Sequence, residues 1–523
     1  MQQPLPDGRG SDRSPNPLPD GRGSERSATP LPNGRGSDRS ANPLPDAGGA
    51  DQGRGSVPPR GLMLPVLSST PPPGARAGSP HSPSGSPHSP DARGRERKAP
   101  SPDDHKISHW SQRRTYHPGS LPQHMAITVL DLDTTKNCNL RCGYCFKSET
   151  VFPGASRMNL DTAMTAIDWL IAASYGANEL WVNLFGGEPL LQFPLIKQLV
   201  PYAKRRAAAQ GKSIQFGCTT NLTLINDEIA EFFRQWGMGW HCSIDGPPEV
   251  QDKQRPGVGG APSSERAERG IQHVLKDRPG AMARATLTPA LVGSMYKSVL
   301  YFEQQGFNSM GFAIADENDW TDDNLREYDH QLTLIREHVR DNWYRKGVDR
   351  EFGAFDHLIR GILSGEQQVQ QCGVGRGMAL IDEHGDVWPC HRFDGADFDS
   401  NSGGAWRFGN MYEDGFNHLM HLAFLDKDRW AAYKPGCAEC PVHTICAGGC
   451  AAANLVNTGS IYYQDYTNCE ASRIAYRHAM ALHDELKAES NPLFMRKFFS
   501  GDYAALNSYS AAAEASSATS AAA

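Results

Sequence analysis

Between residues 126 and 316 the chain alternates short apolar runs with amphipathic stretches. The helical patterns include one that follows Asn159, a typical N-cap residue, and one that ends at Gly237. The apolar runs have the length of buried strands and lie at 127–132, 180–185, 214–218, 239–244, 283–287 and 310–314. This alternation predicts an α/β fold with a parallel sheet, most simply a partial (β/α)6 barrel of the TIM type.

The first 124 residues follow another pattern. They are rich in Pro, Gly, Ser and Arg, and "PLPDGRGSDRS" recurs almost unchanged from Pro4, Pro17 and Pro30. Such a segment cannot bury a core, and its period matches no solenoid repeat. We predict a disordered tail or an upstream repeat translated from a misplaced start, with Met125 as a natural alternative start. The low-complexity end of the chain is also predicted to be disordered.

The patterns divide the chain into five parts. The 321–347 stretch is helical and amphipathic, which is typical of a linker between domains. The parts are a disordered repeat tail (1–124), the barrel (125–320), a helical linker (321–365), a cysteine-rich domain (366–485) and a C-terminal helix with a low-complexity tail (486–523).

Charge and cysteine usage narrow the function. The net charge is -7, and because residues 1–124 carry an excess of basic residues, the rest is more acidic still. Nucleic-acid binding is therefore disfavoured. No apolar run is long enough to span a membrane and no signal peptide is present, so we expect a cytoplasmic protein. All 12 cysteines lie between Cys138 and Cys469, and clustered thiols in a reducing compartment favour metal binding.

Three cysteines are packed into "CNLRCGYC", as Cys138, Cys142 and Cys145. They follow the first predicted strand, and barrels of this kind carry their chemistry in such loops. Thiolates bind soft metals, and three of them would leave one iron of a four-iron cluster open. The alternative, a structural zinc ion, needs four ligands, and no histidine lies close by in sequence.

With Tyr144 before its last cysteine, this motif resembles the signature of the radical S-adenosylmethionine (SAM) superfamily. The resemblance covers about Ile127 to Cys469. It implies that the open iron chelates the amino and carboxylate groups of SAM. It further implies that one electron from the cluster cleaves SAM to a 5'-deoxyadenosyl radical.

Companion motifs extend this resemblance. It implies that the "FGGEP" loop at 185–189, with Glu188, binds the SAM amino group and that Ser243 and Arg255 bind the carboxylate. Asp245, beside Ser243, is equally well explained as a turn residue. The SAM-contacting residues implied together are Tyr144, Gly186, Gly187, Glu188, Thr220, Asn221, Ser243 and Arg255.

Seven later cysteines resemble the SPASM extension, which in the family carries two auxiliary [4Fe-4S] clusters, making three in all. The resemblance implies a near cluster and a distal cluster, bound respectively by Cys372, Cys390 and Cys450 and by Cys437, Cys440, Cys446 and Cys469. Two cubes need eight ligands, so one iron is open or has another ligand. Zinc ribbons that merely hold the fold are the alternative.

The family resemblance implies an enzyme that oxidatively modifies a peptide or protein, with SAM consumed. The stretch after Cys372 looks most like maturases of ribosomally synthesised peptides, which install thioether or carbon-carbon crosslinks. The rival is the anaerobic sulfatase-maturating enzyme, which makes formylglycine and has an aspartate base where this chain has His391. An iron-sulfur electron carrier is a non-enzyme alternative. Expected partners are a flavodoxin or ferredoxin as electron donor and, if a leader is recognised, a separate leader-binding protein.

Overall fold

The structure is a computed structural model, and it describes residues 113–147, 154–315, 319–365, 372–394, 406–426, 436–437 and 439–500. All of them belong to one compact unit, Arg97–Ala523. Predictions for the repeat segment up to residue 112 and for the chain after residue 500 lie outside the described residues.

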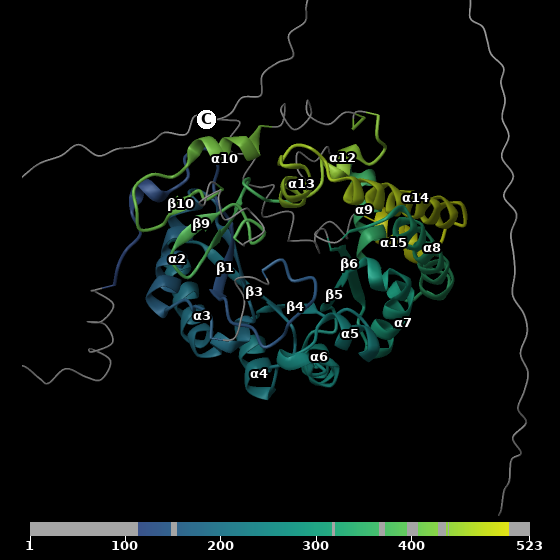
Figure 1. The fold of residues 1–523 in the computed structure, drawn as a ribbon, viewed down its shortest axis with the longest axis horizontal. Helices are drawn as coiled ribbons and strands as arrows, with labels where there is room; N and C mark the ends of the chain where they lie inside the picture. Colours follow the sequence, from purple (N-terminus) through teal and green to yellow (C-terminus); the bar gives the residue numbers. More distant parts are fainter. Residues whose placement is uncertain are drawn as a thin grey trace, which may run out of the picture. The chain divides into compact units, whose positions relative to one another are not determined.

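One sheet runs through the described part of the chain (Figure 1). Its strand order is β10-β9-β8-β1-β2-β3-β4-β5-β6-β7, and the strands from β8 through β1 to β7 are parallel. The first six strands are β1 (Val129–Thr135), β2 (Glu179–Gly186), β3 (Ser213–Thr220), β4 (Gly239–Ser243), β5 (Met282–Leu287) and β6 (Ser309–Ile314). All six predicted strands are therefore confirmed, with bounds that differ by at most a few residues.

The two faces of these strands differ in polarity. Leu130 and Leu132 of β1 belong to the hydrophobic core, whereas Asp131 and Asp133, which alternate with them, point to the other face. In Figure 1 helices lie around the outer side of β1 to β6. The core thus fills the space between strands and helices, and the polar residues line the inside of the barrel.

The helices begin and end where the local sequence directs. Asn159 caps α2 by accepting a hydrogen bond from the Thr162 amide, and Gly237 ends α4 in the left-handed conformation, as predicted. The α-helices are α2 (Leu160–Ala173), α3 (Phe193–Ala208), α4 (Asp227–Trp236), α5 (Pro248–Gln254), α6 (Ser264–Asp277), α7 (Met295–Gln305), α8 (Asp322–His338), α9 (Gly353–Ser364), α10 (His418–Leu425), α12 (His443–Cys446), α13 (Ala451–Thr458), α14 (Tyr466–Ala488) and α15 (Pro492–Phe499). Short 3-10 and π segments are η1 (Pro118–Ser120), η2 (Pro189–Gln192), η3 (Val258–Gly260), η4 (Pro289–Ser294) and η5 (Val339–Tyr344).

The predicted linker and cysteine-rich domain are not separate from the barrel sheet. The linker contributes β7 (Glu351–Phe352), which pairs with β6. The cysteine-rich part contributes β8 (Met378–Ile381), which pairs in parallel with β1, and the antiparallel β9 (Asp386–Trp388) and β10 (Gly409–Asn410) follow it. The two edges of the barrel sheet are therefore completed by later segments of the chain.

Residues 113–124, which we predicted as the end of the disordered tail, pack against the barrel. Arg113 forms an ion pair with Asp168 of α2. The side chain of Ser120 is buried and accepts a hydrogen bond from Trp169 Nε1 at 3.1 Å. The composition did not indicate that this segment is ordered, because the few residues that anchor it are spread among prolines and polar residues.

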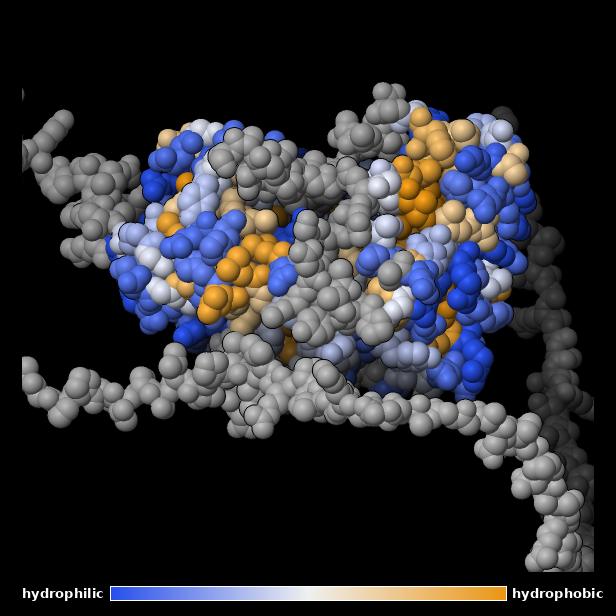
Figure 2. All heavy atoms as spheres, turned by 90° about the horizontal axis from the view of Figure 1, so that it is seen from above, coloured by the Kyte–Doolittle hydropathy of each residue, from blue (hydrophilic) through white to orange (hydrophobic). Residues whose placement is uncertain are grey.

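The surface is mixed in polarity. Figure 2 shows hydrophobic as well as hydrophilic residues on the face seen from above, and α10 exposes Leu419 and Leu422. Among the described residues, no helix has both the length and the hydropathy needed to cross a bilayer.

Candidate functional site

The loop with the first three cysteines leaves the carboxyl end of β1 and is held by a second loop. Its backbone pairs with the end of α5 and the residues after it: Arg141 N donates to Pro256 O at 2.7 Å and Gly143 N donates to Gln254 O at 3.0 Å. Cys138, Cys142 and Cys145 are all half-buried. Their positions are thus fixed by main-chain hydrogen bonds of the protein itself.

The glycine loop after β2 holds the other side of the cysteine loop. Gly187 N donates to Thr135 O at 2.7 Å, and Glu188 N donates to Asn137 O at 2.9 Å. A Cβ on Gly187 would lie 2.3 Å from Asn137 O, so only glycine fits there. The glycines that we predicted to approach a ligand therefore approach the cysteine loop.

Glu188 is buried and ties this glycine loop to the end of β3. Its carboxylate accepts hydrogen bonds from Thr220 Oγ1 and Asn221 N, each at 2.8 Å, and from Leu190 N at 3.1 Å. Burial raises the pKa of Glu188 to about 7. A carboxylate has about four acceptor positions, so one remains for a ligand such as an ammonium group.

Asn221 extends this network to the cysteines. Its side-chain amide donates to Asn139 Oδ1 at 2.9 Å and lies 4.0 Å from Cys138 Sγ. Asn221, which the family resemblance implies as a SAM contact, therefore also holds the cysteine loop against β3.

Asp245 is buried and bonds to several residues, so it does more than form a turn. Its carboxylate accepts from Tyr144 OH at 2.7 Å and from Thr286 N at 2.9 Å. Arg255 Nε lies 2.9 Å from Asp245 Oδ2 as an ion pair without hydrogen-bond alignment, and its guanidinium lies over the Tyr144 ring at 5.3 Å. The predicted SAM contacts Tyr144 and Arg255 thus meet each other, and Asp245 neutralises the charge of Arg255.

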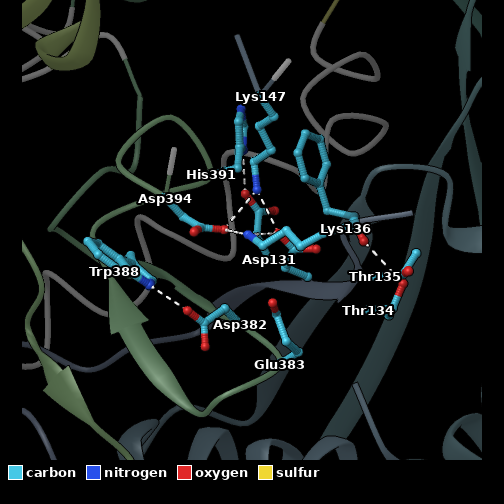
Figure 3. Close-up of polar contacts among 12 residues, drawn as sticks. Asp131, Thr134, Thr135, Lys136, Lys147, Asp382, Glu383, Trp388, His391 and Asp394 are labelled. Carbon is cyan, nitrogen blue, oxygen red and sulfur yellow. Dashed lines mark hydrogen bonds and ion pairs between the residues drawn. The ribbon is translucent and has the colours of Figure 1, made fainter. Parts of the chain in front are cut away.

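Two lysines bracket the cysteine loop and share two aspartates (Figure 3). Lys147 Nζ lies 2.6 Å from Asp133 Oδ2 and 2.8 Å from Asp394 Oδ2, and Lys136 Nζ contacts the same two carboxylates. All four side chains are buried. This ion quartet, Asp133, Lys136, Lys147 and Asp394, ties both ends of the cysteine loop to the segment that follows Cys390.

His391, which stands where the rival enzyme has its aspartate base, lies beside the ion quartet. Its Nδ1 lies 2.6 Å from Asp131 Oδ2, and its ring stacks on Phe185 with centroids 4.4 Å apart (Figure 3 labels His391 and Asp131). Asn183 Nδ2 donates to the other oxygen of Asp131 at 3.1 Å. The imidazole is therefore oriented by a carboxylate of β1 on the inner face of the barrel.

The thiols of the cysteine loop are of the kind that binds iron-sulfur clusters. Burial raises the pKa of Cys138 to about 11 and that of Cys142 to about 12, and neighbouring thiols add to both shifts. In the described ranges, no three His, Cys, Asp or Glu side chains converge closely enough to hold a single metal ion. Thiolates are the ligands that iron-sulfur clusters use, so the side chains present in this loop fit such a group.

The later cysteines form two sets. Cys450 lies close enough to Cys372 and Cys390 for its charge to act on both thiols. Cys437, Cys440, Cys446 and Cys469 line one cavity together with Gln464 and Arg473. The later cysteines thus lie near one another in these two sets, and their assignment as cluster ligands stays a prediction.

Sequence reasoning missed the ion quartet and Asp131. Lys136 and Lys147 lie two residues outside the first and last cysteines of the loop, and Asp131 and Asp133 interrupt an apolar strand. Charged residues inside a buried strand are the signal that could have indicated them, because such residues need partners.

Comparisons with known proteins agree with this site. The family model described as "Radical SAM superfamily" matches residues 132–279. An uncharacterized protein of Methanocaldococcus jannaschii is 36% identical over 147 residues, which are 28% of this chain and 48% of that protein. The chain therefore spans about half the length of this relative.

Longer matches have lower identity. A cysteine-type anaerobic sulfatase-maturating enzyme of Clostridium novyi is 22% identical over 62% of this chain and 88% of its own length. A radical SAM cyclopropyl synthase of Paramaledivibacter caminithermalis is 21% identical over 67% of this chain and 73% of its own. The solved structure "Native anSMEcpe with bound AdoMet" is similar in fold, with a TM-score of 0.58, 19% identity and coverage of 69% of this chain and 99% of that one.

Proposed function

Because the chain is a radical SAM protein related to anaerobic sulfatase-maturating enzymes, we propose that it cleaves SAM reductively and oxidises a peptide or protein. The observation that carries this proposal is the cysteine loop, whose three thiols are held at the barrel mouth by the glycine loop and by the segment after α5. When bound, the cluster and SAM supply a 5'-deoxyadenosyl radical that abstracts hydrogen from the substrate.

The residues of this chain hold and orient these groups. Cys138, Cys142 and Cys145 bind the first cluster, and Glu188 offers its remaining acceptor position to the SAM ammonium. Two auxiliary clusters are bound by the two later cysteine sets, seven cysteines in all. One iron of the near cluster then lacks a cysteine and is open to substrate or to another ligand.

Crosslinking of a ribosomally synthesised peptide is the first candidate reaction. His391, held by Asp131 on the inner face, is our candidate for the base that takes the substrate proton. Formylglycine formation is the second candidate, and the match over 88% of a sulfatase-maturating enzyme favours it. In either reaction the apolar stacking of His391 on Phe185 keeps its ring oriented by Asp131.

The first experiment asks whether SAM is cleaved. Protein reconstituted with iron and sulfide without oxygen is incubated with SAM and dithionite, and 5'-deoxyadenosine is measured. We expect turnover, and we expect none after combined replacement of Cys138, Cys142 and Cys145 by Ala. Cys218→Ala is the matched control, because this cysteine lies in the hydrophobic core and outside the loop. If the protein is only an electron carrier, neither the wild type nor any of these variants should yield 5'-deoxyadenosine.

The second experiment separates the two reactions. The enzyme is coexpressed with a neighbouring short peptide or with a sulfatase, and the modified product is fragmented by mass spectrometry. A crosslink removes two hydrogens and blocks fragmentation between the joined residues. Formylglycine instead carries an aldehyde that reacts with an aminooxy probe, so reaction with this probe would reject the crosslink.

A further inference from the structure

Four strands of the barrel each place one polar side chain on the inner face. These residues are Asp131 of β1, Asn183 of β2, Thr219 of β3 and His241 of β4. Each lies between two buried neighbours in its strand, as Asn183 does between Val182 and Leu184 of the core. Because side chains alternate along a strand, the four polar side chains share the face that the core does not occupy.

A continuous series of polar contacts joins these side chains to His391. His391 Nδ1 lies 2.6 Å from Asp131 Oδ2 (Figure 3), and Asn183 Nδ2 donates to Asp131 Oδ1 at 3.1 Å. Thr219 Oγ1 lies 3.2 Å from Asn183 Oδ1 and 3.3 Å from His241 Nδ1. This series, the inner-face network, connects two histidines from distant parts of the sequence.

Strand register explains the path of the inner-face network. The steps from β1 to β2 and from β3 to β4 join register partners. On β3, however, the register partner of Asn183 is Gly217, which has no side chain to bond. A Cβ there would lie 2.8 Å from Cζ2 of Trp181, so the indole covers this position. Asn183 therefore bonds diagonally to Thr219, further along β3.

The hydrogen bonds of this network have a fixed direction. A carboxylate can only accept, so Asp131 receives one hydrogen from Asn183 Nδ2 and one from His391 Nδ1. The amide oxygen of Asn183 then faces Thr219 and accepts its hydroxyl hydrogen, so the hydroxyl oxygen is left to accept from His241 Nδ1. A hydroxyl turned toward His241 would instead leave two oxygens facing each other at 3.2 Å, which costs a hydrogen bond.

His241 carries a single ring hydrogen near neutral pH. Burial lowers the pKa of His241 to about 4, with the charge of Arg284 acting in the same direction and that of Asp131 against it. A neutral imidazole has one N–H donor and one acceptor nitrogen. With Thr219 as its acceptor, the hydrogen is on Nδ1 and the lone pair is on Nε2.

We infer that Asn183 and Thr219 are positioning residues that fix the tautomers of two histidines in the barrel. In both His241 and His391 the hydrogen is on Nδ1, so Nε2 is the ring nitrogen that can accept a hydrogen bond or a proton. For its chemical use this inference rests on the proposed function, in which His391 is the candidate base: its reacting atom is then Nε2. Asn183 and Thr219 act through their neighbours and not by contact with the substrate.

Nitrogen NMR tests both tautomers in the wild-type protein, because protonated and unprotonated ring nitrogens differ widely in 15N chemical shift. Enzyme labelled with 15N-histidine and isolated without oxygen is measured with oxidised clusters, without SAM or substrate, at about pH 8.5, where an imidazole of ordinary pKa is neutral. Signals are assigned by their loss in His241→Gln and in His391→Gln. We expect Nδ1–H at both histidines, and Nε2–H as the major form of either one in the wild type would overturn the inference.

Thr219→Val tests the network itself, since it keeps the shape of the side chain and removes the acceptor. His241 should change to mainly Nε2–H, the form that free histidine prefers, and Thr219→Ser should restore Nδ1–H. Thr333→Val is the matched control, because this threonine lies on α8 and bonds to Asp329 O. An unchanged His241 tautomer in Thr219→Val would contradict the inference.

Asp131→Asn tests the His391 end of the network. The amide oxygen should stay toward Asn183 Nδ2, which turns the new NH2 group toward His391 and moves the ring hydrogen of His391 to Nε2. Adding Asn183→Leu removes the donor that orients this amide, so Nδ1–H should return in part. If His391 keeps Nδ1–H in Asp131→Asn, the network does not direct its tautomer. Wild type that does not cleave SAM overturns only the proposed function, since the tautomers are measured without SAM, and the wild-type spectrum gives an answer even if a variant does not fold.

Discussion

The two cysteine regions are held in different ways. The loop from Cys138 to Cys145 is fixed by main-chain hydrogen bonds to two other loops and by the buried ion quartet. The distal set, from Cys437 to Cys469, lies in turns, in the short α12 and at the start of α14. In the described part of the chain after β10, no strand supports it.

Under the proposed function, this difference predicts two roles for iron. If the first site binds a cluster as proposed, binding should add little to folding, because the polypeptide already fixes the positions of the three cysteines. Where the ligands are joined mainly by turns, binding free energy becomes folding free energy. We therefore expect the first site to be preformed and the distal region to depend on its cluster.

The largest effect is expected from removing the distal ligands. Replacement of Cys437, Cys440, Cys446 and Cys469 by Ala should reduce the hydrogen-exchange protection of α13 by at least about 100-fold, since the region loses its cluster. The measurement is hydrogen exchange by mass spectrometry under anaerobic conditions, with β1 as internal reference.

The matched experiment removes the first three cysteines instead. Exchange in β1 and in the glycine loop should then change by less than about tenfold, because the main-chain hydrogen bonds remain. Equal loss of protection in the two variants would contradict the comparison.

The ion quartet should come next in size. Lys147→Met leaves two buried carboxylates with one lysine, and breaking such a buried pair costs about 3–5 kcal/mol. The free energy of unfolding by urea should fall by this amount. The double variant Lys147→Met/Asp394→Asn removes one charge of each sign and should recover most of the loss.

The double variant is also the control for the mechanism. The single variant Asp394→Asn completes the set. If the loss of unfolding free energy in the double variant equals the sum of the losses in Lys147→Met and Asp394→Asn, the two charges do not act on each other and the quartet does not hold the loop. Iron content of the first site, measured in the same proteins, shows whether the loop itself has moved.

Local patterns predicted the local parts of this structure. Alternating apolar residues placed the six strands, and Asn159 and Gly237 marked helix ends because caps act within one turn. The family resemblance implied two sets of later cysteines, and their roles as ligands stay a prediction. What could not be predicted depends on contacts between distant segments.

Asp394 is the clearest example. Nothing near it in sequence shows that it contacts Lys136 and Lys147, which are 258 and 247 residues away. The pairing of β8 with β1 could not be predicted for the same reason, since the sequence of a short strand does not indicate with which strand it pairs. Arg255 was assigned to SAM by its spacing from Ser243, and spacing alone could not show that Asp245 neutralises it.

Glu188 should make the barrel less stable as the pH rises. Its pKa is raised by burial from 4.5 to about 7, so between these values the folded state binds more protons than the unfolded state, and stability decreases with increasing pH. The full shift corresponds to about 3 kcal/mol. Urea unfolding of the SAM-free protein between pH 4.5 and 8 measures it.

Glu188→Gln is the control for this titration. The amide does not titrate, so its unfolding free energy should lack this component, whatever its absolute stability. SAM should also flatten the wild-type profile, because an ammonium near Glu188 favours the charged carboxylate. A wild-type profile that rises with pH and is unchanged in the variant would reject the raised pKa.

The smallest effect is expected at Arg473. This residue lines the same cavity as the four cysteines of the distal set. Cys440 and Cys469 raise the pKa of its guanidinium, the first through a hydrogen bond, so Arg473 stabilises charge on these sulfurs. Arg473→Gln should accelerate loss of distal iron to a chelator by about tenfold. Arg477→Gln, one turn further along α14 and paired with Asp329, is the matched control. If both variants lose iron at the wild-type rate, the distal cluster is held by its cysteines alone, and the two regions differ less than their hydrogen bonds indicate.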